Sequence, residues 1–575
     1  MSQKEIIVGI DLGTTNSSIS VLENGKPKII KIDGSSSMPS CVSIDDEGNI
    51  IVGQSAVNQL LVKPNDTHFS VKRHMGSGKI FSIGDEEYRA EEISAFILRK
   101  LREEAQNELG HPVKKAVITV PAYFKEDQRL ATSNAAELAG LDCVRLLNEP
   151  TAAALAYNPN RGSDQNENIL VYDLGGGTFD VSLVTSSEDL VEVKSSHGDT
   201  HLGGDDIDEL LIDFIIDKAQ MLIDRESLST TQLLRLRRAC EAAKRKLSNQ
   251  ATAEISEEYF FNDEHLKIEI FRHEFNELVA PLLEKTWTSV HAALNDAGLV
   301  PSNLNKILLV GGSTHMPIVS NSMEERLGIT PQFDVNPDLI VTMGAALQAG
   351  IIGGEKVEAI LVDISAHTYS TGVLENHGGI GCIPIIKRGS PLPCVKSDLF
   401  YTTHPAQDEV EIDVYQGESR LPDENDLIGA FTIEDLSTSQ SELQPIICEY
   451  ALDLNGMLKV TATEKNTGHA KTVTLDTRGT QQSLDLTAAK EKMAVLYEDE
   501  LTDNDSMLDS SSENTAADQI VARAEKTLES DTLGDEDRTE ITSLLEKIAT
   551  SKQQGAPESV SAAANQLDDI LFYIE

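Results

Sequence analysis

Up to about residue 352, short apolar runs typical of β-strands alternate with amphipathic segments typical of helices. Ile6–Ile10 and Ile169–Tyr172 are such apolar runs, and the alanine-rich segment Gly344–Gly350 is a helix candidate. A regular exchange of strand and helix patterns is typical of an α/β domain. We therefore expect one α/β domain in residues 1–352.

The pattern changes twice in the next part of the chain. Residues 353–362 begin with glycines and continue with charge, as a linker does, and 363–480 consist of short alternating segments separated by Gly, Pro and Asn. In Val410–Val414 apolar and acidic residues alternate at every position, which indicates a sheet with one buried face. Residues 363–480 are therefore predicted to be all-β.

Residues 481–575 switch to helical spacing. Two apolar stripes support this prediction, namely Ile541, Leu544, Leu545 and Ile548, and then Val560, Ala563, Ala564, Leu567 and Leu571. Residues 503–513 are acidic and serine-rich, which predicts a loop or disorder. We expect a short helical region that is interrupted in its middle, at 503–513.

The charge and the cysteines exclude several classes of protein. The chain has 575 residues, with 94 acidic against 48 basic ones, and a formal net charge of −46. Such a surface repels nucleic acid and anionic membrane, and we interpret it as a solvated coat rather than a site for basic partners. The six cysteines have no metal-ligand spacing, and no apolar stretch reaches the length of a membrane span, so we expect a reduced, cytoplasmic protein without a signal peptide.

A glycine-containing turn occurs twice, in Ile10–Ser17 and in Tyr172–Asp180. Each copy lies between an apolar run and an alternating segment, so each is expected on a β-hairpin. Glycines there bring backbone N–H groups close to phosphate oxygens, and Asp11 and Asp173 at the strand ends can hold hydrated magnesium. Two copies in register predict a duplicated nucleotide-binding domain.

Three alternatives compete with this interpretation. A P-loop needs Gly-Lys-Ser/Thr at the start of a helix, and neither turn has a lysine there. A dinucleotide fingerprint needs a glycine near position 180, where the chain has Asp180. An ordinary hairpin turn would explain one copy, but two copies with aspartates in register make it a poor explanation.

Several longer segments of the chain are more specific than the turns, namely Val120–Phe124, Asn148–Ala154, 172–182, His201–Asp206, Val310–Thr314, Asn336–Asp338 and Tyr415–Glu418. Together they resemble one family, the DnaK-type 70-kilodalton heat-shock chaperones, and most closely its short HscC-like branch. The resemblance implies an actin-like ATPase domain (1–352), a linker (353–362), a peptide-binding β-sandwich (363–480) and a shortened helical lid (481–575).

Phosphoryl transfer to water needs a metal, phosphate donors and a group that orients the attacking water. By position, Asp11 and Asp173 would hold Mg²⁺ through water, and the β- and γ-phosphates would contact Gly13, Thr14, Thr15, Asn16, Gly175, Gly176 and Gly177. The resemblance adds Lys72, directed at the γ-phosphate and the water, together with Glu149, Thr178, Asp180, Gly203 and Gly204. It implies ATP and ADP as ligands, with K⁺ as a further candidate ion.

Lys72 and Glu149 are ambiguous when each is taken alone. A single lysine is most often on the surface, because its charge is costly to bury. Glu149 is followed by Pro150 and a run of alanines, a setting where a solvent-facing carboxylate is less expected.

The nucleoside is expected on one helix face. Glu241, Lys244, Arg245 and Ser248 follow at i, i+3, i+4 and i+7. A salt-bridged surface helix is the commoner cause of such spacing. The resemblance instead implies a face that holds adenine and ribose, opposite Gly311, Gly312, Ser313 and Asp338.

Three departures from the family pattern limit what the resemblance implies. His315 stands where relatives place an arginine that stacks on adenine, so the cation–π contribution should weaken. The linker segment Val357–Asp363 keeps only part of the family's leucine-rich run, and the segment between Met75 and Ile93 is short. Domain communication and the choice of nucleotide exchange factor are therefore open.

The resemblance also implies a cleft for extended hydrophobic peptides. Phe400, Val410 and Ile412 would line its pocket, and Thr403 would lie at the arch above it. Alternating apolar residues on a strand are more commonly plain sandwich core. Unfolded clients and a J-domain co-chaperone are the expected partners, and the end Phe572–Glu575, which lacks the tail motifs of eukaryotic relatives, favours a bacterial origin.

Two other functions remain to be separated from an ATP-hydrolysing chaperone. A sugar or glycerol kinase shares the duplicated turn, but nothing after residue 360 is typical of a kinase. A nucleotide-sensing scaffold without catalysis is disfavoured by Asp11, Lys72, Glu149, Asp173 and Thr178, which are all present.

Overall fold

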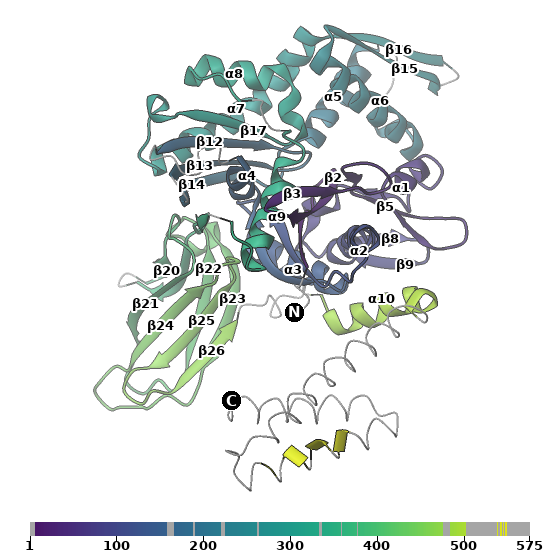
Figure 1. Cartoon of the computed structure of the whole chain (residues 1–575). Coiled ribbons are helices and arrows are strands. Elements are labelled where there is room, and N and C mark those ends of the chain that lie inside the picture. The colour runs from purple at the N-terminus through teal and green to yellow at the C-terminus, as the bar shows by residue number, and fades with distance from the viewer. Residues whose placement is uncertain are drawn as a thin grey trace. The chain divides into compact units, whose positions relative to one another are not determined.

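The computed structural model describes residues 6–157, 166–187, 190–219, 225–261, 264–332, 336–357, 359–375, 378–474 and 484–501, with 538, 541–542, 544–545 and 547–548. The chain divides into two compact units, Met1–Asp485 and Leu486–Glu575 (Figure 1). The first unit contains both the α/β region and the β-sandwich. Among the described helices, none has the length and apolar character needed to cross a membrane.

The first half of the α/β region is built on a sheet with the strand order β11-β10-β1-β2-β3. Its strands are β1 (Ile7–Asp11), β2 (Asn16–Glu23), β3 (Lys26–Ile30), β10 (Lys115–Val120) and β11 (Asp142–Asn148). β1 runs parallel to β10 and antiparallel to β2. The predicted apolar run is therefore a central strand, and the glycine turn that follows it is a hairpin.

The second half repeats this arrangement in a sheet with the order β17-β12-β13-β14-β18. Its strands are β12 (Glu167–Leu174), β13 (Phe179–Ser187), β14 (Leu190–Asp199), β17 (Lys306–Val310) and β18 (Ile360–Val362). β12 is parallel to β17 and antiparallel to β13, as β1 is to β10 and β2. The duplicated, mixed α/β fold expected from the two turns is present.

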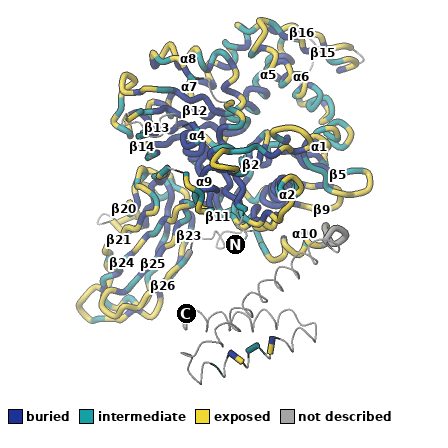
Figure 2. The backbone as a smooth tube through the Cα atoms, viewed as in Figure 1, coloured by how far each residue is buried: buried dark blue, intermediate teal, exposed yellow. Residues whose placement is uncertain are grey.

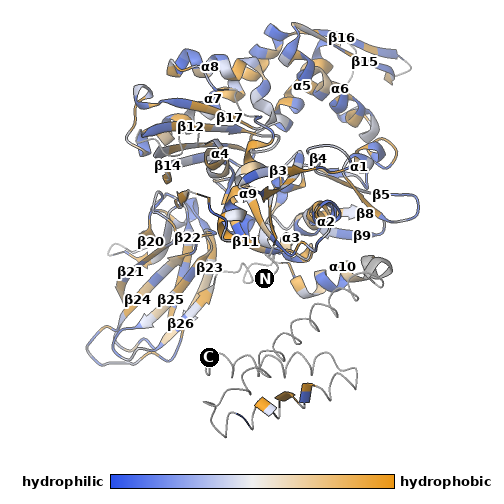
Figure 3. Cartoon of the chain, in the orientation of Figure 1, coloured by the Kyte–Doolittle hydropathy of each residue, from blue (hydrophilic) through white to orange (hydrophobic). Residues whose placement is uncertain are grey.

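Two helices lie between the sheets, α4 (Glu149–Tyr157) and α9 (Ile340–Ile352). α9 contacts β1, β2, β3 and β10, whereas α4 contacts β12, β13 and β14, and the two helices contact each other. Both are almost fully buried in Figure 2, and α9 is coloured as largely hydrophobic in Figure 3. A helix that is apolar on all sides is typical of such a buried position.

Gly344 makes the close crossing of α9 with α4 feasible. A Cβ atom at this position would lie 1.9 Å from the carbonyl oxygen of Ala152 and 2.8 Å from its Cα, so the backbone itself would have to move. We expect Gly344→Ala to lower the free energy of unfolding of the α/β region by about 1–3 kcal/mol, the usual effect of overpacking. Thermal or urea unfolding measures it.

Gly353→Ala is the matched control for this prediction. Gly353 has a φ of −72°, which any residue adopts, and an added Cβ would meet its nearest neighbour at 3.3 Å. We expect a change well below that of Gly344→Ala. Equal stability of the two variants would contradict the proposed crossing.

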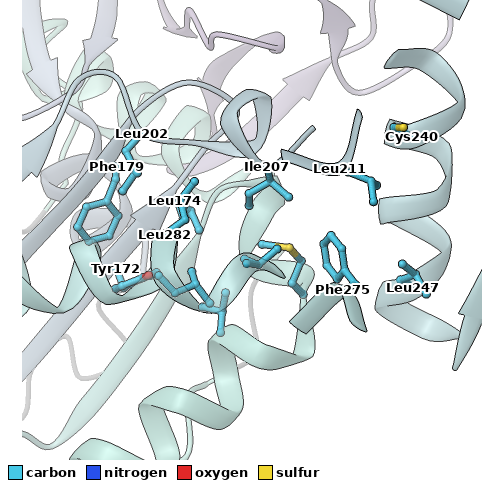
Figure 4. Packing of buried hydrophobic residues seen from close by; sticks show 14 of the residues in the cluster. Tyr172, Leu174, Phe179, Leu202, Ile207, Leu211, Cys240, Leu247, Phe275 and Leu282 are labelled. Carbon is cyan, nitrogen blue, oxygen red and sulfur yellow. The ribbon is translucent and has the colours of Figure 1, made fainter. Parts of the chain in front are cut away.

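The outer part of the second half carries an extensive hydrophobic core. Tyr172, Phe179, Ile207 and Phe275 belong to it, and Figure 4 shows them packed with their neighbours. The elements around it are α5 (Gly204–Lys218), α6 (Thr230–Asn249), β15 (Thr252–Phe261), β16 (Glu264–Phe271), α7 (Arg272–Asp296) and α8 (Pro317–Leu327).

The remaining elements of the first half are β4 (Met38–Pro39), β5 (Cys41–Ile44), β6 (Ile50–Val52), α1 (Gln54–Gln59), β7 (His68–Phe69), β8 (Ile80–Ile83), β9 (Glu86–Arg89), α2 (Ala90–Leu109) and α3 (Glu126–Leu138).

The linker is more ordered than its composition indicates. Ile360–Val362, inside the predicted linker 353–362, form strand β18, which pairs in parallel with β14. Leu361 packs against the core between the sheets, and Ile360 is exposed. These three linker residues therefore form the edge strand of the second sheet, next to β14.

The β-sandwich consists of two four-stranded sheets, β20-β19-β22-β23 and β21-β24-β25-β26. Its strands are β19 (Tyr369–Leu374), β20 (Ile380–Ile386), β21 (Cys394–Tyr401), β22 (Val410–Gln416), β23 (Asp426–Ile433), β24 (Pro445–Leu452), β25 (Leu458–Glu464) and β26 (Ala470–Thr474). One apolar cluster, which includes Val414, Ile433, Tyr450 and Val460, fills the space between them. A β-sandwich, as the alternating pattern predicts, is therefore present between Tyr369 and Thr474.

The helical prediction for the C-terminal region is supported where the structure describes it. α10 covers Leu486–Leu501, and Ile541, Leu544, Leu545 and Ile548 are helical, with Ile541 and Ile548 buried. The acidic break at 503–513 and the stripe from Val560 to Leu571 lie outside the described residues. Of the six cysteines, which are all free, only Cys143 is not fully buried.

Candidate functional site

The two glycine turns face each other. In the hairpins, Asp11 pairs with Ser18 and Asp173 pairs with Asp180, so both aspartates lie at the same relative strand end. A Cβ on Gly176 would lie 1.8 Å from the hydroxyl of Thr15. A Cβ on Gly177 would lie 2.7 Å from the methyl group of Thr14. A side chain at either glycine would force a threonine of the first turn to move, so these glycines let the two turns approach closely and line one cradle.

Further loops close the cradle with backbone contacts. The N–H of Gly204 donates to the carbonyl of Gly175 at 3.0 Å, and the hydroxyl of Ser313 donates to the same carbonyl at 2.8 Å. A Cβ on Gly203 would lie 2.5 Å from the backbone of Gly176. A Cβ on Gly311, whose φ is +84°, would also lie 2.5 Å from the carbonyl oxygen of Leu174. The predicted residues Gly203, Gly204, Gly311 and Ser313 are thus brought together around the second turn.

Four carboxyl groups gather beside the cradle. Asp173, Asp180 and Glu149 are buried, and Asp11 is half-buried at the end of β1. Burial, with the nearby Glu149 charge, raises the pKa of Asp11 to about 7 and that of Asp180 to about 7. Burial and the charges of Glu149, Asp180 and Asp11 also raise the pKa of Asp173 well above its ordinary value. Such mutual repulsion is typical of a site built to receive a cation.

The carboxylate set fits magnesium held through water. Among the described residues, no three His, Cys, Asp or Glu side chains lie close enough together to coordinate a metal ion directly. Mg²⁺ keeps several waters and accepts one or two carboxylates together with phosphate oxygens. The cradle and the flanking aspartates match this donor set.

Lys72 is buried, with 5% of its side chain exposed, so the alternative of a surface lysine is wrong. It lies in a 3₁₀ turn, Val71–His74, after Ser70, whose φ of 54° is left-handed. Its Nζ donates to Oε1 of Glu149 at 2.6 Å and lies 5.6 Å from the ring centre of Phe124. Lys72 thus faces the carboxyl groups as a cation, and its charge opposes the rise in the pKa of Asp11, Asp173 and Asp180.

The residues of the predicted nucleoside face have two different surroundings, because Lys244 contacts the cradle and Arg245 lies on the surface. On α6, Lys244 donates to the carbonyl of Gly204 at 2.9 Å and to the buried carboxylate of Asp208 at 2.8 Å, which ties the helix to the cradle. Arg245 is 68% exposed and pairs with Glu241, as in an ordinary surface helix. Ser248 follows on the same face, half-buried.

The family model described as Hsp70 protein matches residues 7–81 and 78–574. The chain belongs to the Hsp70 family. Hsp70 proteins are chaperones that bind and hydrolyse ATP with Mg²⁺, and they bind unfolded client segments and J-domain co-chaperones. The general function expected from the sequence is confirmed at this level.

Several residues of the Hsp70 site were missed by sequence reasoning. The hydroxyl of Thr119 donates to Oδ1 of Asp11 at 2.9 Å, and two backbone N–H groups, of Ala122 and Tyr123, donate to Asp180. Asp208, the partner of Lys244, is buried, which raises its pKa to about 6. The register of β1 on β10 places Thr119 beside Asp11, and that pairing cannot be inferred from local pattern.

His315 and Asp338 lie together at the edge of the site. His315 Nε2 is 3.3 Å from Oδ2 of Asp338, and both side chains are about half exposed. Both exposed side chains can therefore face a bound adenine, as the resemblance implies.

We expect His315→Arg to lower the nucleotide dissociation constant two- to fivefold. A guanidinium keeps the partner Asp338 and adds a cation–π contact worth about 0.5–1 kcal/mol. Isothermal calorimetry with ADP measures the change. His111→Arg, at an exposed position of the same domain, adds the same charge and should leave affinity unchanged. Unchanged binding in His315→Arg would remove His315 from the pocket.

The four residues predicted for the peptide cleft lie in one sandwich. Ile412 on β22 belongs to the core cluster, while Phe400 and Val410 pack against its edge and remain partly exposed. Thr403 is exposed, and its N–H and hydroxyl donate to Oε1 of Gln407 at 2.8 and 3.0 Å. Ile412 is surrounded as a residue of the sandwich core is, which is the alternative interpretation of the alternating pattern.

Proposed function

We propose that this Hsp70 protein is an ATP-dependent chaperone of the short HscC-like branch in a bacterial cytoplasm, in which hydrolysis at the acid cluster controls peptide capture and release. The observation that carries the proposal is a continuous set of hydrogen bonds from the acid cluster to the β-sandwich. It runs through Pro121–Phe124, the segment that follows β10.

The chemical roles follow from the positions of the side chains. Asp11 and Asp173 would hold Mg²⁺ through water, and the metal would neutralise charge on the phosphates. The N–H groups of the two turns would bind the β- and γ-phosphates. Lys72, held by Glu149, would orient the attacking water and stabilise charge that develops in the transition state. Thr178 and Asp180 would complete the water and metal shell.

Tyr123 connects this site to the sandwich. Its N–H donates to Asp180, and its carbonyl accepts a hydrogen bond from Nε2 of His367, 3.0 Å away. The ring of His367 also packs on that of Tyr123, with centroids 4.5 Å apart. A shift of Asp180 during the ATP cycle would therefore move the residue that the sandwich contacts.

Arg129 on α3 makes a second connection. Its guanidinium donates to the carbonyls of Ala122 and Phe124, to Oδ1 of Asn148 and to the carbonyl of Asn455 in the sandwich. Asn148 precedes Glu149 and donates to Oδ2 of Asp363 at the end of the linker. Nucleotide and peptide sites that share such contacts must influence each other reciprocally.

For the peptide end of the cycle, we propose that Phe400, Val410, Ile412 and Thr403 bind an extended hydrophobic segment under a short helical lid. Unfolded clients would be captured after hydrolysis and released on ATP binding, with a J-domain co-chaperone stimulating hydrolysis. A nucleotide exchange factor and K⁺ are further candidates for this cycle, and each can be added to the assay below.

One experiment separates this proposal from its alternatives. ATP turnover is measured with no small-molecule acceptor, and then with unfolded peptide and with each J-protein of the source organism. We expect slow basal turnover that peptide and one J-protein stimulate. Turnover only with a sugar or glycerol acceptor would indicate a kinase, and binding without turnover would indicate a scaffold.

A further inference from the structure

Glu126, at the start of α3, is a fully buried carboxyl group between the α/β region and the sandwich. None of its side chain is exposed. Its Oε1 accepts a hydrogen bond from the N–H of Leu458 on β25 at 2.8 Å, and its own N–H lies 3.5 Å from Oε1 of Gln416 on β22. Among the described residues, no hydrogen-bond donor reaches Oε2.

The groups that face Glu126 do not compensate a negative charge. Arg129 is the nearby cation, and its guanidinium is already engaged by three carbonyls and Asn148. Asp127 on the same helix and Asp453 in the turn after β24 have the same sign as a Glu126 carboxylate. Lys125 pairs with Asp426 instead. Tyr369 on β19 faces Glu126 with a neutral hydroxyl, which adds no positive charge.

An isolated buried carboxylate is so unfavourable that the group takes up a proton instead. Burial accordingly raises the pKa of Glu126 from its ordinary 4.5 to about 8. The sandwich builds much of this dry environment, through Leu458, Gln416 and Tyr369. Without the sandwich, Glu126 would lie in the first turn of a helix, in water, where a carboxylate is favoured.

We propose that docking of the sandwich onto the α/β region takes up a proton at Glu126, so that pH sets the balance between the docked and separated states. This regulation rests on the proposed function only for its consequence, the coupling of peptide binding to hydrolysis. Docking itself can be measured without any turnover.

The direction of the effect follows from the two states. Below about pH 4.5 Glu126 is protonated in both, and docking has its full strength. As pH rises toward 8 the separated state ionises while the docked state does not, so docking weakens by up to about tenfold per pH unit.

His367 acts in the opposite direction and in a lower range. Burial lowers its pKa to about 4 from an ordinary 6.5, so its protonation opposes docking as pH falls from about 6.5 to about 4. Burial also raises the pKa of Asp363, although hydrogen bonds from Asn148, Thr151 and Ile364 and the charges of Arg129 and Arg145 oppose the rise. Among the charged groups at the contact with the sandwich, Glu126 therefore dominates the pH dependence between about pH 6.5 and 8.

Hydrogen exchange of the β18 amides in the full chain tests the proposal, because the pairing of this strand with β14 is part of the docked arrangement. Protection is measured with ADP and with ATP from pH 6.5 to 8, relative to a synthetic peptide of the linker sequence. We expect the wild type to lose protection by about five- to tenfold per unit. Glu126→Gln, which cannot ionise, should stay constant within about twofold across this range.

Two further variants make the result decisive. Glu137→Gln makes the same substitution at the exposed end of α3 and should keep the wild-type loss. His367→Gln can still donate to Tyr123 and should also keep it. Constant protection in the wild type would overturn the proposal, as would an unaltered slope in Glu126→Gln. Loss of the slope in His367→Gln would assign the titration to His367 and overturn it too. The ATPase assay is scored separately, so failure of the chaperone assignment would be recognised independently.

Discussion

Lys72→Ala is expected to lower ATP turnover by about 10²- to 10³-fold while ATP affinity stays within a few fold. The lysine is buried against Glu149 and faces the carboxyl cluster, where water is scarce and its charge acts strongly. Its proposed action is on the attacking water and the transition state, so its loss should appear in kcat rather than in binding. Single-turnover hydrolysis and calorimetry with ATP separate the two quantities.

Two companion variants decide how Lys72 acts. Glu149→Gln keeps the shape of its partner but removes the charge, so we expect a substantial loss of turnover if the Lys72–Glu149 pair works as a unit. Lys79→Ala, at an exposed position nearby, should leave turnover unchanged. If Lys72→Ala hydrolyses ATP at the wild-type rate, the lysine serves only to neutralise buried acids.

Features of the site that depend only on neighbouring residues, such as the two hairpin turns, could be predicted from the sequence. A glycine turn between an apolar run and an alternating run specifies a hairpin by itself, and so the equivalence of Asp11 and Asp173 could be inferred from the sequence alone. Helical spacing likewise indicated the face of α6 that carries Lys244. These inferences need only a few neighbouring residues.

What could not be predicted depends on contacts between distant segments. Thr119 reaches Asp11 because β1 and β10 pair in parallel, and Asp208 reaches Lys244 across two helices. The burial of Lys72 is likewise a result of packing, which the residues next to it in the chain do not indicate. Arginine is most often a surface residue, yet the buried guanidinium of Arg129 joins Asn148 to Asn455.

The linker is the clearest case in which packing supplies what composition does not indicate. Because it keeps only part of the family's leucine-rich run, the sequence left domain communication open. In the structure, three residues of the linker nevertheless pair with the edge strand β14 and add a strand to the sheet. In the register of β18, Leu361 is paired with Val191, a fully buried residue of the core between the sheets. Ile360 is 64% exposed, so the two neighbours point in opposite directions.

This alternation gives a sharp test of linker docking. Leu361→Asp is expected to shift the docking equilibrium toward the separated state by about 5- to 150-fold, because it removes an apolar contact and places a charge against the core, on the order of 1–3 kcal/mol. Protection of the β18 amides should fall accordingly, and stimulation of ATP turnover by peptide should be lost.

Ile360→Asp introduces the same charge one residue earlier, on the exposed face of the same strand. We expect it to retain most of the protection and most of the stimulation by peptide, because its carboxylate stays in water. Equal effects of the two variants would mean that linker charge, not burial of Leu361, controls docking. If Leu361→Asp kept full stimulation by peptide, the signal would have to pass through the Tyr123–His367 and Arg129–Asn455 contacts alone, and the added strand would be dispensable for coupling.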